Sequence, residues 1–287
     1  MIVARTIAEA RAALRELPRP LGFTPTMGAL HEGHLSLVDG ARARCSAVAA
    51  SIFVNPTQFG RGEDYQRYPR DERRDLRLLE ERGVDLVFAP EADEMYADGF
   101  ATQLHVGGTL TETFEGASRP SHFDGVAVIV AKLINIVRPD VLFLGEKDAQ
   151  QLAVVRRFVR DLDLTVEVVG LPTVREPDGL AMSSRNAYLT PAQRAQAPDL
   201  NRALLAGAAA AGEGAEHVVA RTVNVLREGL APIDIDYVAV VDADTFRQER
   251  TIGPRALLVA AVRLGSTRLI DNIPLTTSAY PAEDATT

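Results

Sequence analysis

The chain has 287 residues, 46% of them hydrophobic and 24% charged, which is the composition of an ordinary globular protein with ample material for a core. The 39 acidic and 31 basic residues give a formal net charge of −8, which argues against broad contact with nucleic acid, because phosphate backbones are bound through excess positive charge. The single cysteine excludes a disulfide within the chain.

The N-terminal segment, residues 1–17, has the pattern of an amphipathic helix. It lacks the apolar core and the cleavage site of a signal peptide. No stretch of the chain approaches the roughly 20 apolar residues of a membrane span. We therefore expect a cytoplasmic protein that binds neither membrane nor nucleic acid.

Apolar runs typical of buried parallel strands then alternate with helical patterns. The predicted strands are 21–24, 47–54, 85–89, 141–144 and 165–169, and the helices between them include the charged segment 69–82 and the apolar segment 125–137. This alternation indicates an α/β fold with a Rossmann-like, doubly wound parallel sheet. In such sheets ligands gather at the carboxyl ends of the strands.

The stretch after the first strand, residues 25–34 (PTMGALHEGH), predicts a glycine-containing turn and the start of a helix. Helix N-termini favour phosphate, because their N–H groups are unpaired and their partial charge is positive. His31 and His34, three residues apart, lie on the same side of the helix and could donate hydrogen bonds to phosphate oxygens. The other histidines of the chain lack the spacing of zinc ligands, so we favour phosphate over a metal.

Polar segments also follow the second and fourth strands. Asn55 and Gln58 offer side-chain amides that both donate and accept hydrogen bonds, which suits a small anionic substrate, although a simple Asn-Pro turn is an equally good interpretation. In the segment 145–151 (GEKDAQQ), Lys147 is a candidate phosphate partner, and an exposed surface lysine is the alternative.

A further glycine-led loop, residues 179–186 (GLAMSSRN), combines two serine hydroxyls with the guanidinium of Arg185. These are phosphate donors that could close over a leaving pyrophosphate. Clusters of serine and arginine are common on protein surfaces, so the loop by itself is a weak signal.

The motifs together resemble a known family. HEGH resembles the HIGH signature of class I aminoacyl-tRNA synthetases and related nucleotidyltransferases, and MSSR resembles the mobile KMSKS loop of the same superfamily. Four ordered motifs, PTMGALHEGH, FVNPTQF, GEKDAQQ and MSSRN, resemble the pantothenate synthetase (pantoate–β-alanine ligase) family, and the resemblance covers residues 6–273.

The resemblance implies a ligase that uses ATP and Mg²⁺ and is a homodimer. Pantoate carboxylate would attack the α-phosphate of ATP to give pantoyl adenylate and pyrophosphate. The amine of β-alanine would then attack the acyl carbon, forming pantothenate, a precursor of coenzyme A, and releasing AMP.

The resemblance also implies site residues. It makes His31, His34, Lys147 and Arg185 catalytic, with His34 favoured for proton transfer. Gln58, Gln151 and Asn55 would contact pantoate and β-alanine, while Arg119 and His122 would neighbour the pocket. The residues implied to bind ATP are Met27, Gly28, His31, His34, Gly145, Glu146, Lys147, Asp148, Val174, Met182, Ser183, Ser184 and Arg185. No metal ligand is assigned.

The sequence pattern changes after residue 175. Alanine-rich helices are predicted over 191–211 and 215–228, followed by strands over 235–241, 256–261 and 267–273. We predict a catalytic domain over 1–175, a small C-terminal α+β lid domain over 176–275 and a disordered tail over 276–287.

Two other interpretations stay open. One is a different HIGH-type nucleotidyltransferase acting on a small phosphorylated substrate, which would not need Gln58 and Gln151 together. The other is a nucleotide-binding regulatory module without turnover.

Overall fold

The computed structural model describes residues 1–229 and 233–275, so the predicted tail 276–287 lies outside the described residues. The described residues form two compact units. The first comprises Met1–Val174 and Met182–Ser184, and the second comprises Arg175–Ala181 and the described residues from Arg185 onward. The segment Met182–Ser184 therefore belongs with the first unit, although the chain on either side of it belongs to the second.

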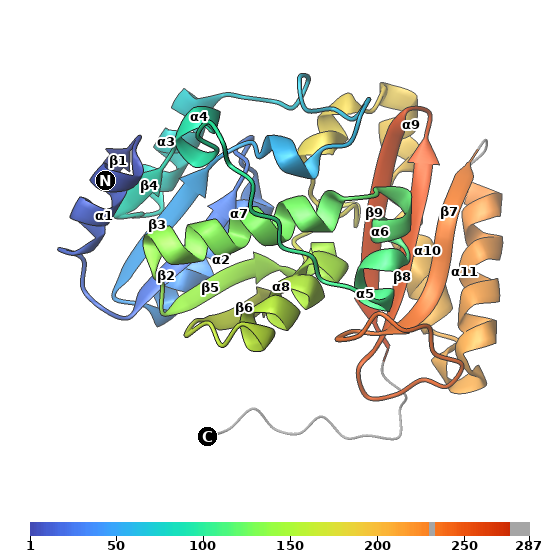
Figure 1. The fold of residues 1–287 in the computed structure, drawn as a ribbon. Helices are drawn as coiled ribbons and strands as arrows, with labels where there is room; N and C mark the ends of the chain where they lie inside the picture. The colour runs from blue at the N-terminus through green and yellow to red at the C-terminus, as the bar shows by residue number, and fades with distance from the viewer. Residues whose placement is uncertain (230–232, 276–287) are drawn as a thin grey trace. The chain divides into compact units, whose positions relative to one another are not determined.

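The first unit is built on a parallel sheet in the order β1-β4-β3-β2-β5-β6 (Figure 1). Its strands are β1 (Ile2–Ala4), β2 (Leu21–Thr26), β3 (Ala47–Ile52), β4 (Leu86–Phe88), β5 (Val141–Gly145) and β6 (Glu167–Leu171). The predicted α/β class with a doubly wound parallel sheet is confirmed.

The strand order reverses between β2 and β5. From β2 the chain adds β3 and β4 on one side, and it then adds β5 and β6 on the other side. Loops that leave the carboxyl ends of β2, β3 and β5 therefore meet at a topological switch point, where open α/β sheets bind their ligands. The three most informative motifs of the sequence follow these three strands.

Helices cover both faces of this sheet, because successive side chains of a buried strand point to opposite faces. In β3, Ala47 and Ala49 join the core beneath α1, α7 and α8, whereas Val48 and Ala50 join the core beneath α2 and α3. The helices are α1 (Ile7–Leu14), α2 (Glu32–Arg44), α3 (Glu72–Glu81), α4 (Ala92–Met95), α5 (Thr109–Glu112), α6 (Glu115–Ser118), α7 (His122–Val137) and α8 (Ala149–Asp161), with 3-10 turns η1 (Pro56–Gln58) and η2 (Glu146–Asp148).

The second unit is an antiparallel sheet in the order β7-β8-β9, packed with helices, and the predicted α+β class of this part is confirmed. Its strands are β7 (Asp234–Asp242), β8 (Ala256–Leu264) and β9 (Thr267–Pro274). The helical elements from residue 184 onward are η3 (Ser184–Tyr188), α9 (Pro191–Gln196), α10 (Asp199–Ala208), η4 (Ala211–Glu213) and α11 (Ala215–Gly229).

Two predicted helices differ from the structure. The N-terminal segment begins with β1 rather than with a helix, because Ile2–Ala4 pairs in parallel with β4 at the edge of the sheet. The helix predicted over 191–211 is divided into α9 and α10 at Pro198, whose ring and missing N–H interrupt a helix.

Candidate active site

The turn after β2 has an unusual backbone. Gly28 and Ala29 have φ values of 77° and 50°, so two consecutive residues adopt the left-handed conformation. A Cβ atom on Gly28 would lie 2.9 Å from Oδ2 of Asp75, so this position requires glycine. The turn ends at His31, which is the N-cap of α2.

The backbone around this helix start fixes the tautomers of both histidines. Gly33 N–H donates to Nδ1 of His31 over 3.1 Å, and His31 N–H donates to Nδ1 of His34 over a longer 3.4 Å. A backbone N–H can only donate, so both Nδ1 atoms are acceptors. Each neutral imidazole therefore carries its proton on Nε2 and has that N–H available for a ligand.

Both imidazoles are neutral at physiological pH. Burial, supported by the nearby charge of Lys147, lowers the pKa of His31 to about 4. Burial, supported by the neighbouring His31, lowers the pKa of His34 to about 3. The ring centroids are 4.1 Å apart, so the two histidines form one compact pair of neutral donors.

Lys147 lies near this pair, directly after the strand β5, which is adjacent to β2. It lies on η2, and its side chain is 20% exposed. Its charge contributes to the lowered pKa of both His31 and His34, and its Nζ is 3.7 Å from Oδ1 of Asp148. The structure thus brings Lys147, Asp148 and the two histidines together, whereas the side chain of Glu146 lies against Gly170 of β6.

The segment Met182–Ser184 packs against the same turn. Ser184 Oγ donates to the carbonyl oxygen of Ala29 over 3.1 Å, and the Cβ of Met182 lies 3.6 Å from the position that a Cβ would occupy on Gly33. Met182 N–H donates to the carbonyl oxygen of Val174 over 3.0 Å. Arg185 follows this segment and is the residue at which the chain re-enters the second unit.

Gln58 and Asn55 lie after β3 in a hydrogen-bond network. Backbone groups determine which end of each side-chain amide donates and which accepts. Asn55 Oδ1 accepts from Thr57 N–H, and Asn55 Nδ2 donates to the carbonyl oxygen of Gly125 over 3.1 Å. The same Nδ2 donates to Gln58 Oε1 over 3.0 Å. The Gln58 amide is therefore oriented with Nε2 away from Asn55, where it lies 3.3 Å from the sulfur of Met27.

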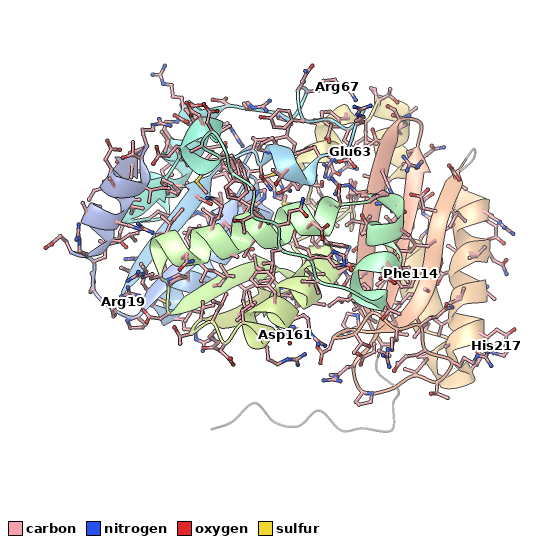
Figure 2. All side chains as sticks on the ribbon, viewed as in Figure 1. Arg19, Glu63, Arg67, Phe114, Asp161 and His217 are labelled. Atoms are coloured by element: carbon pink, nitrogen blue, oxygen red, sulfur yellow. The ribbon has the colours of Figure 1, made fainter. Side chains whose placement is uncertain are left out.

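The carbonyl oxygen of Gln58 is held as well. His122 Nδ1 donates to it over 2.9 Å, and Arg119 approaches it at 3.3 Å while pairing with Glu63 at 2.6 Å (Glu63 is labelled in Figure 2). Burial and the charge of Arg119 lower the pKa of His122 to about 4, so this imidazole is neutral. Arg119 and His122 thus hold the backbone of Gln58 in place through its carbonyl oxygen.

The two glutamines at the start of α8 have different roles. Gln150 is buried, and its side chain accepts from Glu115 N–H and donates to the carbonyl oxygens of Leu110 and Thr113. Gln151 is half-buried, and across the described parts of the chain its side chain makes no hydrogen bond. Gln150 therefore supports a loop, while Gln151 keeps its amide for another partner.

Two residues near the site were not expected from the sequence. Tyr96 OH donates to Asn55 Oδ1 over 2.7 Å and completes the network around Gln58. Asp75 is buried on α3, in a segment whose dense charge predicted a solvated helix. A signal was present, because Asp75 precedes the buried Leu79 by four residues and so lies on the apolar face of α3.

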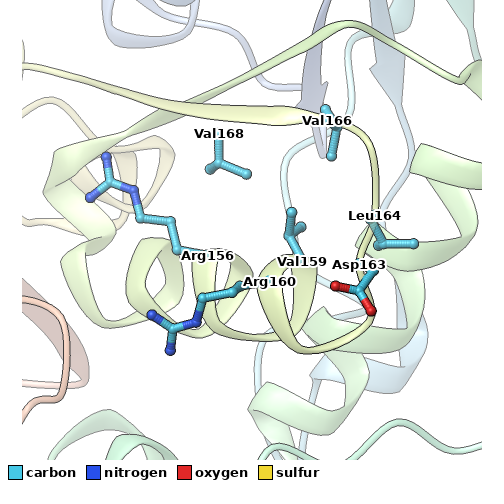
Figure 3. Close-up of a pocket in the computed structure, with 7 residues that line it drawn as sticks. All are labelled: Arg156, Val159, Arg160, Asp163, Leu164, Val166 and Val168. Atoms are coloured by element: carbon cyan, nitrogen blue, oxygen red, sulfur yellow. The ribbon is translucent and has the colours of Figure 1, made fainter.

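A separate hollow lies beside the edge strand β6 (Figure 3). It contains none of the predicted site residues and faces the amino-terminal end of β6, opposite to the switch-point loops. Its lining residues are Arg156, Val159, Arg160, Asp163, Leu164, Val166 and Val168.

Within residues 1–229 and 233–275, no three His, Cys, Asp or Glu side chains form a group that could hold a metal ion. No helix in these ranges is both long and apolar enough to cross a membrane.

A doubly wound sheet with paired histidines, a lysine and a serine segment at its switch point defines an α/β enzyme of the nucleotide-binding type. The family described as pantoate–β-alanine ligase matches residues 2–274. The chain belongs to this family, and the resemblance noted from its motifs is confirmed.

Curated relatives named pantothenate synthetase agree with this assignment. The protein of Chloroflexus aggregans is 57% identical over 278 residues, covering 95% of this chain and 99% of the relative. The protein of Gluconobacter oxydans is 53% identical over 277 residues, covering 96% and 100%.

Solved structures agree at the level of the fold. The crystal structure of pantothenate synthetase from Thermus thermophilus has a TM-score of 0.92 at 52% identity and covers 96% of this chain and 99% of its own. The crystal structure of pantoate–β-alanine ligase from Francisella tularensis, complexed with beta-gamma ATP and β-alanine, has a TM-score of 0.80 at 33% identity and covers 96% of this chain and 97% of its own.

Proposed function

We propose that the chain condenses pantoate with β-alanine in an ATP-dependent reaction that passes through pantoyl adenylate. In the first step a carboxylate oxygen of pantoate forms a bond to the α-phosphorus, and the bond from that phosphorus to the bridging oxygen breaks, releasing pyrophosphate. In the second step the β-alanine amine forms a C–N bond to the acyl carbon, loses a proton, and AMP leaves with the C–O bond electrons.

The observation that carries this proposal is the pair of neutral Nε2–H donors on His31 and His34 next to Lys147. Negative charge accumulates on the phosphates in the first step, and preorganised donors stabilise it without reorganising. Neutral imidazoles suit this task, because each already carries an N–H group and needs no further proton to donate a hydrogen bond. Gly145 and Asp148 border the same place beside the lysine.

The position of the segment Met182–Ser184 supports a role at the phosphates for Met182, Ser183 and Ser184, since Ser184 bonds to the turn that carries the histidines and Met182 packs beside Gly33. Arg185, which follows it, would supply a guanidinium to the leaving pyrophosphate. Met27, Gly28 and Val174 would line the nucleotide side through backbone and apolar contacts.

Gln58 and Gln151 would hold the acid substrate. The network around Asn55 directs the Nε2 donor of Gln58 away from Asn55 and toward Met27. A donor is what a substrate carboxylate or carbonyl oxygen requires, and the amide has a second N–H besides the one facing Met27. Gln151, with an amide free of other hydrogen bonds in the described chain, would supply the second contact.

Mg²⁺ bound with a nucleotide is held mainly by phosphate oxygens and water, with one or two protein carboxylates. Asp148, whose Oδ1 is 3.7 Å from Lys147 Nζ, is the carboxylate at this place and fits this limited role. When bound, the ion would neutralise phosphate charge during adenylation. A homodimer and a cytoplasmic location remain predictions from the family resemblance.

Pyrophosphate–ATP isotope exchange tests the function directly. We expect exchange with pantoate present and β-alanine absent, because adenylation is reversible before the amine attacks. Exchange that does not depend on pantoate would point to another acceptor, and ATP binding without any exchange would indicate a module without turnover.

A further inference from the structure

The helix α3 places a buried carboxylate against the turn that precedes the histidines. The side chain of Asp75 is 1% exposed. Its Oδ2 accepts from Ala29 N–H over 2.8 Å, and its Oδ1 accepts from Leu30 N–H over 2.9 Å. The neighbouring Arg74 donates from Nη1 to the carbonyl oxygen of Leu30 over 2.8 Å. One turn of α3 therefore makes three hydrogen bonds to two consecutive residues.

The turn needs such support because its backbone is strained. Ala29 has a φ of 50°, which costs a residue with a Cβ atom free energy relative to its ordinary conformations. Its N–H and that of Leu30 point into the protein and would lose water without gaining a partner if Asp75 were absent. Two adjacent donors require two acceptors, and a carboxylate provides both.

The conformation of the turn decides where the imidazoles lie. Two residues after Ala29, His31 caps α2, and its backbone N–H bonds to His34, so a shift of the turn moves both rings. Leu30, which lies between Ala29 and His31 and is 1% exposed, anchors the turn in the core. A displacement of about 1 Å at catalytic groups can reduce a rate by roughly 10²-fold.

We propose that Asp75, assisted by Arg74, is a positioning residue that holds the turn at Gly28–Leu30 so that His31 and His34 present their Nε2–H groups to the reacting phosphates. This inference rests on the proposed adenylation reaction. Asp75 acts through the backbone of the turn and touches no substrate.

The test is Asp75→Asn, assayed by pantoate-dependent pyrophosphate–ATP exchange. Wild-type exchange establishes the reaction first, so a failure of the proposed function is seen independently of the variant. Asparagine replaces one acceptor with a donor that faces a backbone N–H. We expect kcat for exchange to fall roughly 10²-fold, with the KM values for ATP and pantoate nearly unchanged, because positioning matters most in the transition state.

Asp71→Asn is the matched control, since it removes the same charge from the same helix. Asp71 caps α3 by accepting from Arg74 N–H, and asparagine is an equally good cap. We expect wild-type kcat from this variant. A second variant, Ala29→Gly combined with Asp75→Asn, should recover part of the lost kcat, because glycine adopts the left-handed conformation without strain.

A wild-type kcat in folded Asp75→Asn would overturn the inference, and so would a raised KM at unchanged kcat, which would indicate a ligand contact. A double variant no faster than Asp75→Asn would contradict the role of the strained turn. If Asp75→Asn does not fold, Arg74→Met decides: a loss of kcat at saturating substrates supports the inference, and an unchanged kcat refutes it.

Discussion

The orientation of the Gln58 side-chain amide follows from its hydrogen-bond partners. An amide group has a donor end and an acceptor end of nearly equal size, so its orientation must be inferred from partners of known polarity. Here Thr57 N–H and the carbonyl oxygen of Gly125 determine the orientation of Asn55, and Asn55 determines that of Gln58. The site is thus left with a donor, as an anionic substrate requires.

Gln58→Glu tests this polarity. Glutamate can still accept from Asn55, but it would present a second carboxylate oxygen where Gln58 presents Nε2–H. Because like charges that face each other cost several kcal/mol, we expect the KM for pantoate to rise roughly 10²-fold. Steady-state kinetics with pantoate as the varied substrate measures it.

Gln248→Glu is the control, because it makes the same change of charge at an exposed residue of the second unit. We expect wild-type kinetics from it. A wild-type KM for pantoate in Gln58→Glu would mean that Gln58 presents its oxygen, or that it does not contact the substrate acid.

At the scale of elements, α7 and η1 approach one another more closely than side chains would allow. A Cβ atom on Gly125 would lie 2.4 Å from the carbonyl oxygen of Thr57 and 2.6 Å from the nitrogen of Gln58, both of them backbone atoms. The apolar face of α7 holds it on the sheet, since Val126, Ile129 and Leu133 are buried there. The contact is therefore set by the packing of α7 rather than by the loop.

Gly125→Ala should consequently push η1 out of place. We expect the free energy of unfolding to fall by about 1–3 kcal/mol, as for other overpacked sites, and the KM for pantoate to rise because Gln58 moves. Urea denaturation and steady-state kinetics measure the two effects. Gly212→Ala, where a Cβ atom would meet nothing within 4 Å, is the control and should change neither. Unaltered stability in Gly125→Ala would contradict the close approach.

At the scale of the whole molecule, the buried histidines make folding depend on pH. Burial lowers the pKa of His31 and His122 to about 4 and that of His34 to about 3, below the ordinary value of about 6.5. Between these values the unfolded chain binds protons that the folded chain does not. The free energy of unfolding therefore falls as the pH falls from about 7 toward 4.

His34→Gln should weaken this dependence. Glutamine takes up no proton, so the loss of stability between pH 7 and about pH 5 should be smaller by roughly 1–2 kcal/mol than in the wild type. Urea denaturation of the ligand-free protein at the two pH values measures the difference. His217→Gln, at an exposed position on α11 (Figure 2), should keep the wild-type dependence. Equal dependence in His34→Gln would mean that His34 takes up its proton over the same pH range in the folded chain as in the unfolded chain.

Much of this molecule was predictable from local pattern. The buried parallel strands, the antiparallel strands of the second unit and the helix start at Thr190 are coded by short-range periodicity and by a capping box that the structure contains. The N-terminal strand β1 was not, because its few residues gain their stability from pairing with β4, far along the chain.

The same division holds for the candidate site. The sequence by itself determined which residues follow the carboxyl ends of β2, β3 and β5, because strand-to-loop boundaries are local, and it determined the family through four motifs in order. The site roles of those residues remain predictions for the experiments above. Only the tertiary structure decided that the strand order reverses between β2 and β5, and that Asn55 orients Gln58. It also decided that Asp75 bonds to the turn at Ala29, since hydrogen bonds and burial between residues far apart in the chain depend on how the helices pack on the sheet.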